Sequence, residues 1–382
     1  MKLRIGFIGL GAMGLSHVHS IRKLCGDKAE VAALCAMSEA NLKNAVAEAP
    51  GAKVFRNKTE LIESPLDAIF VSTPNFTHVK LAEAILSAGK HLFLEKPCGI
   101  TREECYRLLE LADRSDRVVM IGHELRYSPY FERFNAMIQA GEVGRPRMVW
   151  TREFRGPFQK KSGDWIQDDR KSGGCLVDKN SHHFDLMNWW VGSRPQRVAA
   201  FGGCAVNRMI EGEHQVNDHA TVSFEYENGV RGTLQLCMFA LDFPHEDLEM
   251  GIIGDEGTLV TRISRIEILQ WKRGSNQREP LVHHVNAKPG EGWGSHLGFD
   301  EIHPAFLECI LGKKAPLTSV RNCLDGTLLA IAAEESIKKG TMVDVQKMNN
   351  PFPRGAASVQ ATPRLPKFPT SGPPGSSPRR LP

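Results

Sequence analysis

Apolar and polar positions in the first 122 residues follow two alternating rhythms. Short apolar, β-branched runs predict strands, and apolar residues recurring every three or four positions between them predict amphipathic helices. The expected strands are Leu3–Ile8, Glu30–Cys35, Ala68–Ser72, His91–Leu94 and Val118–Ile121, and the expected helices are Met13–Leu24, Glu39–Glu48, Thr77–Ala88 and Thr101–Ser115. This alternation predicts an α/β fold with a doubly wound parallel sheet and right-handed crossovers.

The rhythm changes after about residue 145, where apolar and polar residues alternate in consecutive segments separated by turn signals such as Glu227-Asn228-Gly229. The expected strands are Arg147–Phe154, Arg197–Val206, Ala220–Tyr226, Val230–Met238, Asp247–Ile253, Thr258–Thr261 and Ile266–Trp271. Consecutive strands with hairpin-like turns predict a mostly antiparallel or mixed sheet. Two helices, Phe299–Leu311 and Val320–Lys338, are expected to close the folded region.

These patterns predict three parts: a Rossmann domain at 1–122, a second α/β domain at 123–350 and a tail at 351–382. The two terminal helices either stay with the second domain or pack back on the first. The tail lacks periodicity and holds 9 of the 22 prolines, which favours an extended arm over a packed element. Such an arm either wraps a neighbouring subunit or is disordered, and disorder is the favoured expectation.

Composition changes this picture little. A 41% hydrophobic and 24% charged chain is ordinary for a globular protein, and no apolar run approaches the roughly 18 to 20 residues of a membrane span. The start, Met1–Ile8, passes directly into a strand pattern, so we expect no signal peptide. Nine scattered cysteines without C-x-x-C indicate reduced thiols in a cytoplasmic protein.

The net charge of +4 belongs to the tail. Residues 351–382 carry five Lys and Arg and no Asp or Glu, a charge of +5. Taking +5 from +4 leaves −1 on the first 350 residues. The expected folded region is therefore almost neutral, and its charge indicates neither a nucleic-acid nor a membrane partner.

A glycine-rich turn follows the first expected strand. Gly9, Gly11 and Gly14 form G-x-G-x-x-G around Ala12 and Met13, at the start of a helix. In this context the glycines allow a tight turn, backbone approach to a pyrophosphate, and close packing of helix on strand. Free N–H groups at the helix N-terminus favour the same anion. We therefore predict dinucleotide binding.

The segment that should select between NAD and NADP is unusual. An acidic residue is expected at the end of the second strand to bind the ribose 2′-hydroxyl, but the chain reads Cys35-Ala36-Met37-Ser38. A 2′-phosphate meets no carboxylate in this stretch and no neighbouring arginine, and Ser38 can bind either form. NAD and NADP both remain open, with a slight preference for NAD.

Three further segments carry polar chemistry. Ser72–His78 and Glu95-Lys96-Pro97 each follow an expected strand, at the sheet edge where open α/β folds bind ligands. The third, Gly173–Asp185, places Asp178 and His182 at i and i+4 if it is helical, with Asp185 at i+7.

Together these motifs resemble the Gfo/Idh/MocA family, which includes glucose–fructose oxidoreductase and inositol dehydrogenase. The resemblance runs through G-x-G-x-x-G, S-T-P-N-x-x-H, E-K-P and G-G-x-x-x-x-D-x-x-x-H-x-x-D, and covers about residues 3–345. It implies a Rossmann domain followed by an open-faced α/β domain that acts on sugars, polyols and related compounds. Cys175 and Asn180 depart from the family's glycines.

The resemblance also implies roles for individual residues. Lys96 and His182 would flank the reacting alcohol with Asp178 beside them, His182 as general base and Lys96 positioning the hydroxyl. A base of near-neutral pKa suits proton removal during hydride transfer. Residues expected to bind the cofactor are Gly9, Gly11, Ala12, Met13, Gly14, Ala36, Ser38, Thr73, Pro74, Asn75, His78, Glu95 and Lys96.

Residues expected to bind substrate are Lys96, Arg126, Tyr127, Trp165, Asp178, His182 and His183. Arg126 and Tyr127 either line the active site or pair structurally with the next helix, and Trp165 either stacks on a sugar or anchors a surface loop. His183 competes with His182 for the role of base. A metal site made of Asp178, His182, His183 and Asp185 is the less favoured reading, and we expect no metal.

The leading functional hypothesis is an NAD(P)-dependent dehydrogenase or reductase acting on a sugar, cyclic polyol or glycoside. A redox-assisted glycosidase that oxidises, eliminates and returns the hydride would use the same residues. A cofactor-binding sensor without catalysis is the third reading, and the intact Lys96, Asp178 and His182 argue against it. The resemblance implies a homodimer or homotetramer. The substrate, the reacting carbon, the direction of reaction and the use of the tail are not fixed by the sequence.

Overall fold

The computed structural model of the chain describes residues 2–158, 161–207, 214–240, 246–276, 278–287 and 297–346. These residues belong to one compact unit, 1–348. The expected tail, 351–382, lies outside the described residues. Among the described helices, none is both long and apolar enough to cross a membrane.

The N-terminal half forms a six-stranded sheet in the order β3-β2-β1-β4-β5-β6, with every pairing parallel. The strands are β1 (Leu3–Ile8), β2 (Ala29–Cys35), β3 (Lys53–Phe55), β4 (Ala68–Val71), β5 (His91–Leu94) and β6 (Val119–Ile121). The expected doubly wound sheet is confirmed. The strand order reverses between β1 and β4, and ligands bind such sheets at the carboxyl ends beside this point.

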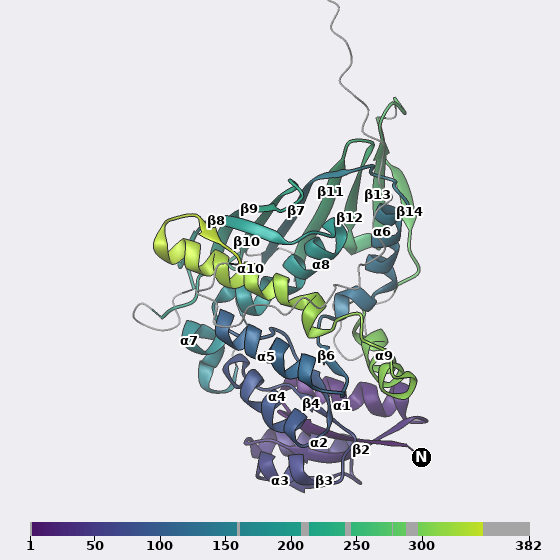
Figure 1. The fold of residues 1–382 in the computed structure, drawn as a ribbon, viewed down its shortest axis with the longest axis vertical. Coiled ribbons are helices and arrows are strands. Elements are labelled where there is room, and N and C mark those ends of the chain that lie inside the picture. Colours follow the sequence, from purple (N-terminus) through teal and green to yellow (C-terminus); the bar gives the residue numbers. More distant parts are fainter. Residues whose placement is uncertain are drawn as a thin grey trace, which may run out of the picture. The chain divides into compact units, whose positions relative to one another are not determined.

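Helices connect these strands on both sides of the sheet (Figure 1). They are α1 (Ala12–Cys25), α2 (Glu39–Glu48), α3 (Lys58–Glu63), α4 (His78–Ser87) and α5 (Arg102–Arg114). β3 and α3 were not predicted from the sequence. Both are very short, and β3 has only one buried residue, Phe55, so that hydrophobic alternation could not reveal it.

The second half forms a nine-stranded sheet in the order β14-β13-β12-β11-β7-β10-β9-β8-β15. Its strands are β7 (Pro146–Arg155), β8 (Pro195–Gly203), β9 (His219–Tyr226), β10 (Arg231–Cys237), β11 (Glu246–Gly254), β12 (Gly257–Arg262), β13 (Glu267–Lys272), β14 (Leu281–His284) and β15 (Val343–Asp344). β7 and β10 pair in parallel and the other pairings are antiparallel. The expected mostly antiparallel sheet is confirmed.

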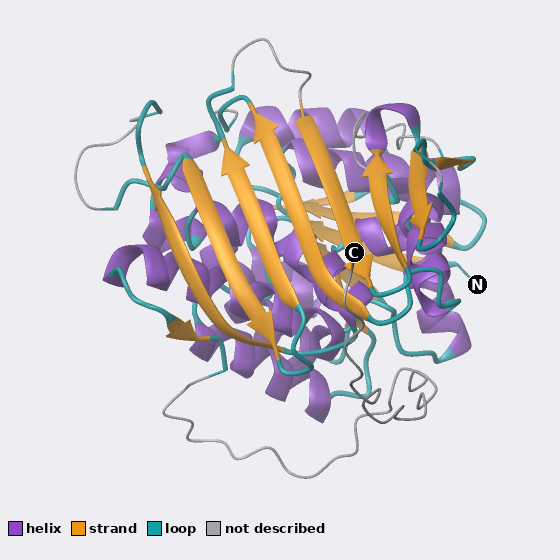
Figure 2. Cartoon of the chain, turned by 90° about the horizontal axis from the view of Figure 1, so that it is seen from above, coloured by secondary structure: helices purple, strands orange, loops and turns teal. Residues whose placement is uncertain are grey.

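In the described part of the chain, helices cover one face of this sheet and leave the other open. Figure 2 looks onto the strands, with helices behind them. The helices of this half are α6 (Pro129–Gln139), α7 (Asp169–Ser172), α8 (Ser181–Val191) and α10 (Val320–Lys339). In β9, buried residues alternate with more exposed ones, as expected for a sheet with one packed face.

The two terminal helices have different partners. α9 (Phe299–Gly312) packs on α1 (Figure 1), and its Ile302, Phe306 and Leu307 are fully buried in the core around β1 and β4. α10 instead packs on α8, β8 and α5. Between them, the amide of Ile121 at the end of β6 donates to the carbonyl of Thr318 (2.9 Å). Residues far along the chain therefore complete the first domain.

Candidate active site

The glycine turn has the shape that a pyrophosphate requires. Gly9 has a φ of +89°, and a Cβ there would lie 2.5 Å from the carbonyl oxygen of Ser72. A Cβ on Gly14 would lie 2.0 Å from the carbonyl oxygen of Gly9, so helix and turn touch. Gly11 faces open space, and no side chain caps the α1 N-terminus. This cradle fits a dinucleotide phosphate.

The part of this edge formed by β2 and β3 contains an arginine that the sequence pattern did not predict. Phe55 in β3 pairs with Cys35 in β2, so Arg56 follows directly beside Ala36. The Arg56 guanidinium forms a bidentate ion pair with the carboxylate of Glu39, with N–O distances of 2.8 and 2.9 Å. The interpretation that no arginine stands near this site was wrong, because the short strand β3 brings Arg56 across to it. Ser38 accepts the amide N–H of Asn41 and caps α2.

The loops after β4 and β5 are tied together by a buried histidine. The ring nitrogens of His78 lie 3.0 Å from the carbonyl oxygen of Thr73 and 3.1 Å from that of Pro97. Burial lowers the pKa of His78. His78 thus joins the loop containing Pro74 and Asn75 to the loop containing Lys96.

The loop after β4 also reaches the second domain. The side-chain amide of Asn75 donates to a carboxylate oxygen of Asp178 and to the carbonyl oxygen of Ser172, both at 2.9 Å. The ammonium of Lys96 donates to the backbone carbonyl oxygen of Asp178 at 2.6 Å. The structure therefore brings Lys96 and Asp178, predicted to act together, into direct contact.

Asp178 lies in an irregular stretch of helix. Residues Leu176–Asn180 form a π-helix that continues into α8, and such widened turns are frequent at functional sites. Burial raises the pKa of Asp178, but Lys96, the hydrogen bond from Asn75 and two further lysines outweigh it and hold that pKa below its usual value. Asp178 is therefore a carboxylate at neutral pH.

The two adjacent histidines of α8 face different surroundings. His182 Nδ1 lies 3.6 Å from a carboxylate oxygen of Glu124, and its ring stands perpendicular to that of His123 with 5.2 Å between centroids. His183 Nδ1 lies 3.0 Å from Asn180 Nδ2 and 3.5 Å from Glu153 on β7. His182 therefore faces the end of β6, whereas His183 faces the sheet of the second domain.

Two residues expected to bind substrate are held in structural contacts. The guanidinium of buried Arg126 donates to both carboxylate oxygens of Asp185, at 2.6 and 2.7 Å. The hydroxyl of Tyr127 lies 3.3 Å from that of Thr318, and burial raises the pKa of Tyr127 to about 12. Trp165, the third such residue, is half-buried in the short helix Ser162–Gln167.

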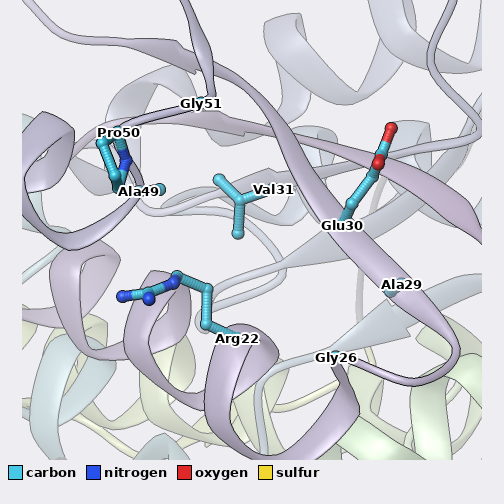
Figure 3. A pocket seen from close by; sticks show the side chains of 8 residues that line it. All are labelled: Arg22, Gly26, Ala29, Glu30, Val31, Ala49, Pro50 and Gly51. Carbon is cyan, nitrogen blue, oxygen red and sulfur yellow. The ribbon is translucent and has the colours of Figure 1, made fainter.

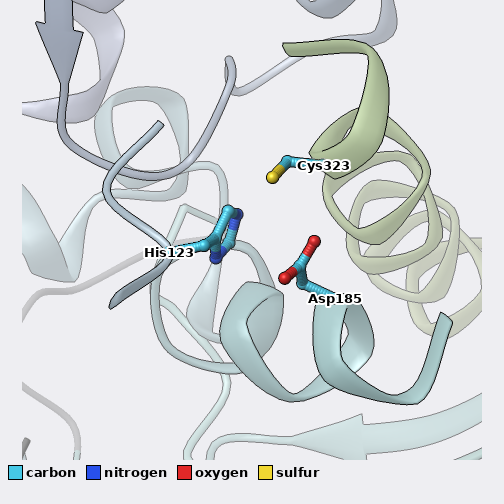
Figure 4. Close-up of side chains that lie close together, drawn as sticks. All are labelled: His123, Asp185 and Cys323. Atoms are coloured by element: carbon cyan, nitrogen blue, oxygen red, sulfur yellow. The ribbon is translucent and has the colours of Figure 1, made fainter. Parts of the chain in front are cut away.

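Figure 4 shows His123, Asp185 and Cys323, whose potential metal-ligand atoms all lie within 4.8 Å of one another. No other group of three such residues was found in the part of the chain that the structure describes. Arg126 occupies both oxygens of Asp185, and burial raises the pKa of the Cys323 thiol well above its usual range. A cation here would compete with a guanidinium and a thiol proton, so the trio does not suit a metal ion.

Figure 3 shows a pocket of a different kind. It includes the first residues of β2, so it lies at the amino end of that strand, away from the carboxyl ends. Its lining residues are Arg22, Gly26, Ala29, Glu30, Val31, Ala49, Pro50 and Gly51. The pocket therefore does not belong to the candidate site.

Comparison with known proteins agrees with this geometry. A family model described as "Oxidoreductase family, NAD-binding Rossmann fold" matches residues 3–123, and one described as "Oxidoreductase family, C-terminal alpha/beta domain" matches residues 135–345. Myo-inositol 2-dehydrogenase of Thermotoga maritima is 29% identical over 233 residues, 61% of this chain and 67% of that protein. The scyllo-inositol 2-dehydrogenase (NAD(+)) of Bacillus subtilis is 23% identical over 356 residues, 90% of this chain and 96% of that protein.

Solved structures show the same fold. Levoglucosan dehydrogenase in complex with NADH has a TM-score of 0.79 and 21% identity, covering 91% of this chain and 100% of that chain. A scyllo-inositol dehydrogenase from Lactobacillus casei has a TM-score of 0.75 and 20% identity, covering 91% of this chain and 99% of that chain. Since two family models together match most of the sequence, the chain belongs to the Gfo/Idh/MocA family of oxidoreductases, with an NAD-binding Rossmann domain at its N-terminus.

Proposed function

We propose that this oxidoreductase is an NAD(P)-dependent dehydrogenase that moves a hydride between the nicotinamide and a hydroxyl-bearing or keto carbon of a sugar, cyclic polyol or glycoside. The observation that carries the proposal is the contact of the Lys96 ammonium with the backbone of Asp178, one helical turn before His182. Relatives named as inositol dehydrogenases support the substrate class.

The proton chemistry falls to two side chains. His182 takes the hydroxyl proton on its ring Nε2, since its Nδ1 faces Glu124. The ammonium of Lys96 stabilises the negative charge that develops on the substrate oxygen as that proton leaves. Asp178 is ionised and anchored by Asn75, so it can accept a hydrogen bond from a neighbouring substrate hydroxyl.

The cofactor would lie along the carboxyl edge of the parallel sheet. Gly9, Gly11, Ala12, Met13 and Gly14 would hold the pyrophosphate on the α1 N-terminus. Ala36 and Ser38 would lie at the adenosine end, and Thr73 and Pro74 beside the glycine turn. When bound, the nicotinamide supplies the hydride acceptor. We propose NAD as the preferred form, with NADP as the alternative.

The open face of the nine-stranded sheet supports a homodimer or homotetramer. Met148 and Ile253 lie opposite each other on β7 and β11, 49% and 37% exposed, and Phe201 on β8 is 80% exposed. Strand alternation places all three on the side away from α8 and α10. Apolar residues on such a face favour association with a second copy. We propose a cytoplasmic location, in keeping with nine free cysteines.

The test is a cofactor and substrate screen. Purified protein with NAD or NADP should change absorbance at the nicotinamide band with a member of a sugar and inositol panel. Lys96→Ala and His182→Ala should each lower kcat by at least 100-fold while cofactor binding, followed by fluorescence titration, stays within twofold.

His183→Gln is the matched comparison, because His183 contacts Asn180 and Glu153 rather than the end of β6. Activity lost in His183→Gln but kept in His182→Ala would overturn the assignment of the base. Failure of both cofactors to bind would overturn the dehydrogenase proposal. A cofactor that copurifies and a glycoside cleaved without net reduction would instead indicate the redox-assisted glycosidase.

A further inference from the structure

Glu124 is a buried carboxylate beside the proposed base. Its carboxylate oxygen lies 3.6 Å from His182 Nδ1, and the two side chains are only 7% and 6% exposed. Glu124 begins the short 3-10 helix Glu124–Tyr127, which follows β6 at the carboxyl edge of the sheet. The pair therefore joins the end of the first domain to the first turn of α8 in the second.

The backbone of Glu124 is held closely. At Gly298, directly before α9, a Cβ would lie 2.2 Å from the Glu124 carbonyl oxygen. Only glycine fits there, and its φ of +90° also favours glycine. Two residues further on, the Arg126–Asp185 ion pair fixes the same 3-10 helix to α8. These contacts hold the Glu124 side chain against His182 rather than leaving it on a mobile loop.

The sequence motif predicts Asp178 beside the proposed base His182, but other partners hold the Asp178 carboxylate. Asp178, the acidic member of the D-x-x-x-H motif, accepts the amide of Asn75 and lies against Lys96 through its backbone. The His182 ring instead forms an ion pair with Glu124. At 3.6 Å the Glu124–His182 contact is an ion pair rather than a hydrogen bond. A carboxylate on the Nδ1 side of a catalytic imidazole favours the proton on that atom and leaves Nε2 as the basic nitrogen.

We propose that Glu124 is a positioning residue for hydride transfer, which keeps His182 in the tautomer with its proton on Nδ1 and stabilises the imidazolium formed when Nε2 takes the substrate proton. This inference rests on the proposed function, because it requires His182 as the base. It assigns to Glu124 a role that nothing in the sequence motif indicates.

Other charged and titratable groups surround the pair. They are Lys96 after β5, His123 before the 3-10 helix, Asp178 on the π-helix and the Arg126–Asp185 pair. Burial lowers the pKa of His123, so this imidazole is neutral and adds no charge at neutral pH. Arg126 and Asp185 neutralise each other. The ion-pair contact of the His182 ring is with Glu124.

The test compares Glu124→Gln with the parent protein over pH 5 to 9, using the substrate found in the screen. Gln keeps the size of Glu124 and removes its charge, so oxidation should lose roughly 10- to 100-fold in kcat. The acidic limb of the kcat/KM profile should move to lower pH by about one unit, because the imidazolium loses its neighbouring carboxylate. A purely structural role for Glu124 would lower activity without moving this limb.

Selective ¹⁵N-histidine labelling gives a readout apart from turnover. In the parent protein His182 should carry its proton on Nδ1, and in Glu124→Ala it should show a mixture of tautomers. The matched control is Glu132→Gln, a change of the same kind at an exposed position on α6, which should leave rate, pH profile and tautomer unchanged.

The outcomes separate the two proposals. If His182→Ala is inactive but Glu124→Gln has the parent kcat and pH profile, the role of Glu124 is wrong and the proposed function stands. If His182→Ala keeps full activity, the base assignment fails first, and the proposal for Glu124 fails with it. An Nε2-protonated His182 in the parent protein would also overturn the proposal.

Discussion

His17 in α1 lies 2.8 Å from Glu95, through its Nε2 and the carboxylate Oε1. Its other ring nitrogen lies 2.8 Å from Nε2 of His303 in α9. Both imidazoles are buried among Phe70, Phe93 and Phe299. Because Glu95 directly precedes Lys96, this series of three side chains connects α1 and α9 to the proposed catalytic lysine.

Removing His303, the last side chain of the Glu95–His17–His303 series, should destabilise the protein. His303→Ala takes away a hydrogen-bond partner of His17 and leaves a cavity between aromatic rings, so we expect the free energy of unfolding to fall by about 3 kcal/mol. Chemical denaturation measures this change. His284→Ala is the control, since its side chain is 77% exposed, and should stay within about 0.5 kcal/mol. Equal small effects of both substitutions would contradict the prediction.

The Arg126–Asp185 pair should be far more sensitive to losing one partner than to losing both. Its side chains are 4% and 2% exposed, so Asp185→Asn leaves a buried guanidinium without its counter-charge and should cost about 3 to 5 kcal/mol of stability. The double variant Arg126→Met with Asp185→Leu should be more stable than the sum of its single variants Arg126→Met and Asp185→Leu predicts, which a double-mutant cycle measures. A loss that simply adds across the two sites would show that the pair is not coupled.

Cofactor choice should depend on Glu39 and Arg56. Their ion pair is exposed and therefore weak, and we expect Glu39 to compete with a 2′-phosphate for the Arg56 guanidinium. Glu39→Gln should raise affinity for NADP about fivefold while changing affinity for NAD little, and Arg56→Ala should lower affinity for NADP alone. Fluorescence titration with each cofactor measures both effects. Parallel changes for NAD and NADP would exclude this role.

Glu334 gives an expected dependence of stability on pH. This buried carboxyl on α10 accepts the amide of Leu176, and burial raises its pKa to about 7 from the usual 4.5. Between pH 4.5 and 7 the folded state binds more protons at this site than the unfolded state, so its contribution to stability is present at low pH and is lost as pH rises through 7. The loss should total about 3 kcal/mol.

The measurement is denaturant unfolding at pH 5 and pH 8 for the parent protein and Glu334→Gln. The parent should lose more stability than the variant between these pH values, because Gln does not ionise. Glu335→Gln, the neighbouring and more exposed carboxylate, tests whether the difference belongs to Glu334. Identical differences between pH 5 and 8 in the parent and in Glu334→Gln would contradict the prediction.

Much of the fold could be predicted from local patterns. Strand–helix alternation and the glycine turn specified the parallel sheet, because each strand buries a continuous apolar run such as Ala68–Val71. β3 could not be predicted, because three residues with one buried side chain show no hydrophobic periodicity. The sequence also could not show that α9 and α10 pack on different domains, because the same amphipathic pattern suits a helix on either domain.

The site was predictable where one short motif contained the chemistry, as for Lys96 and Asp178, which do meet. It was not predictable where partners come from distant segments. Spacing within α8 could not show that His183 faces Glu153 on β7 while His182 faces Glu124 after β6. The sequence indicated Arg126 and Tyr127 as candidates, but it could not indicate Glu124, whose contact with His182 depends on tertiary packing.

The placement of α9 affects how this chain can fold during synthesis. Ile302, Phe306 and Leu307 fill the core around β1 and β4, and His303 completes the chain to His17. These residues leave the ribosome only after the whole nine-stranded sheet apart from β15 has been made. Domains generally fold as they emerge from the ribosome. The first domain cannot complete its aromatic core until α9 has been made, so part of that core stays exposed in the meantime. We expect chaperones to bind the nascent chain during this interval.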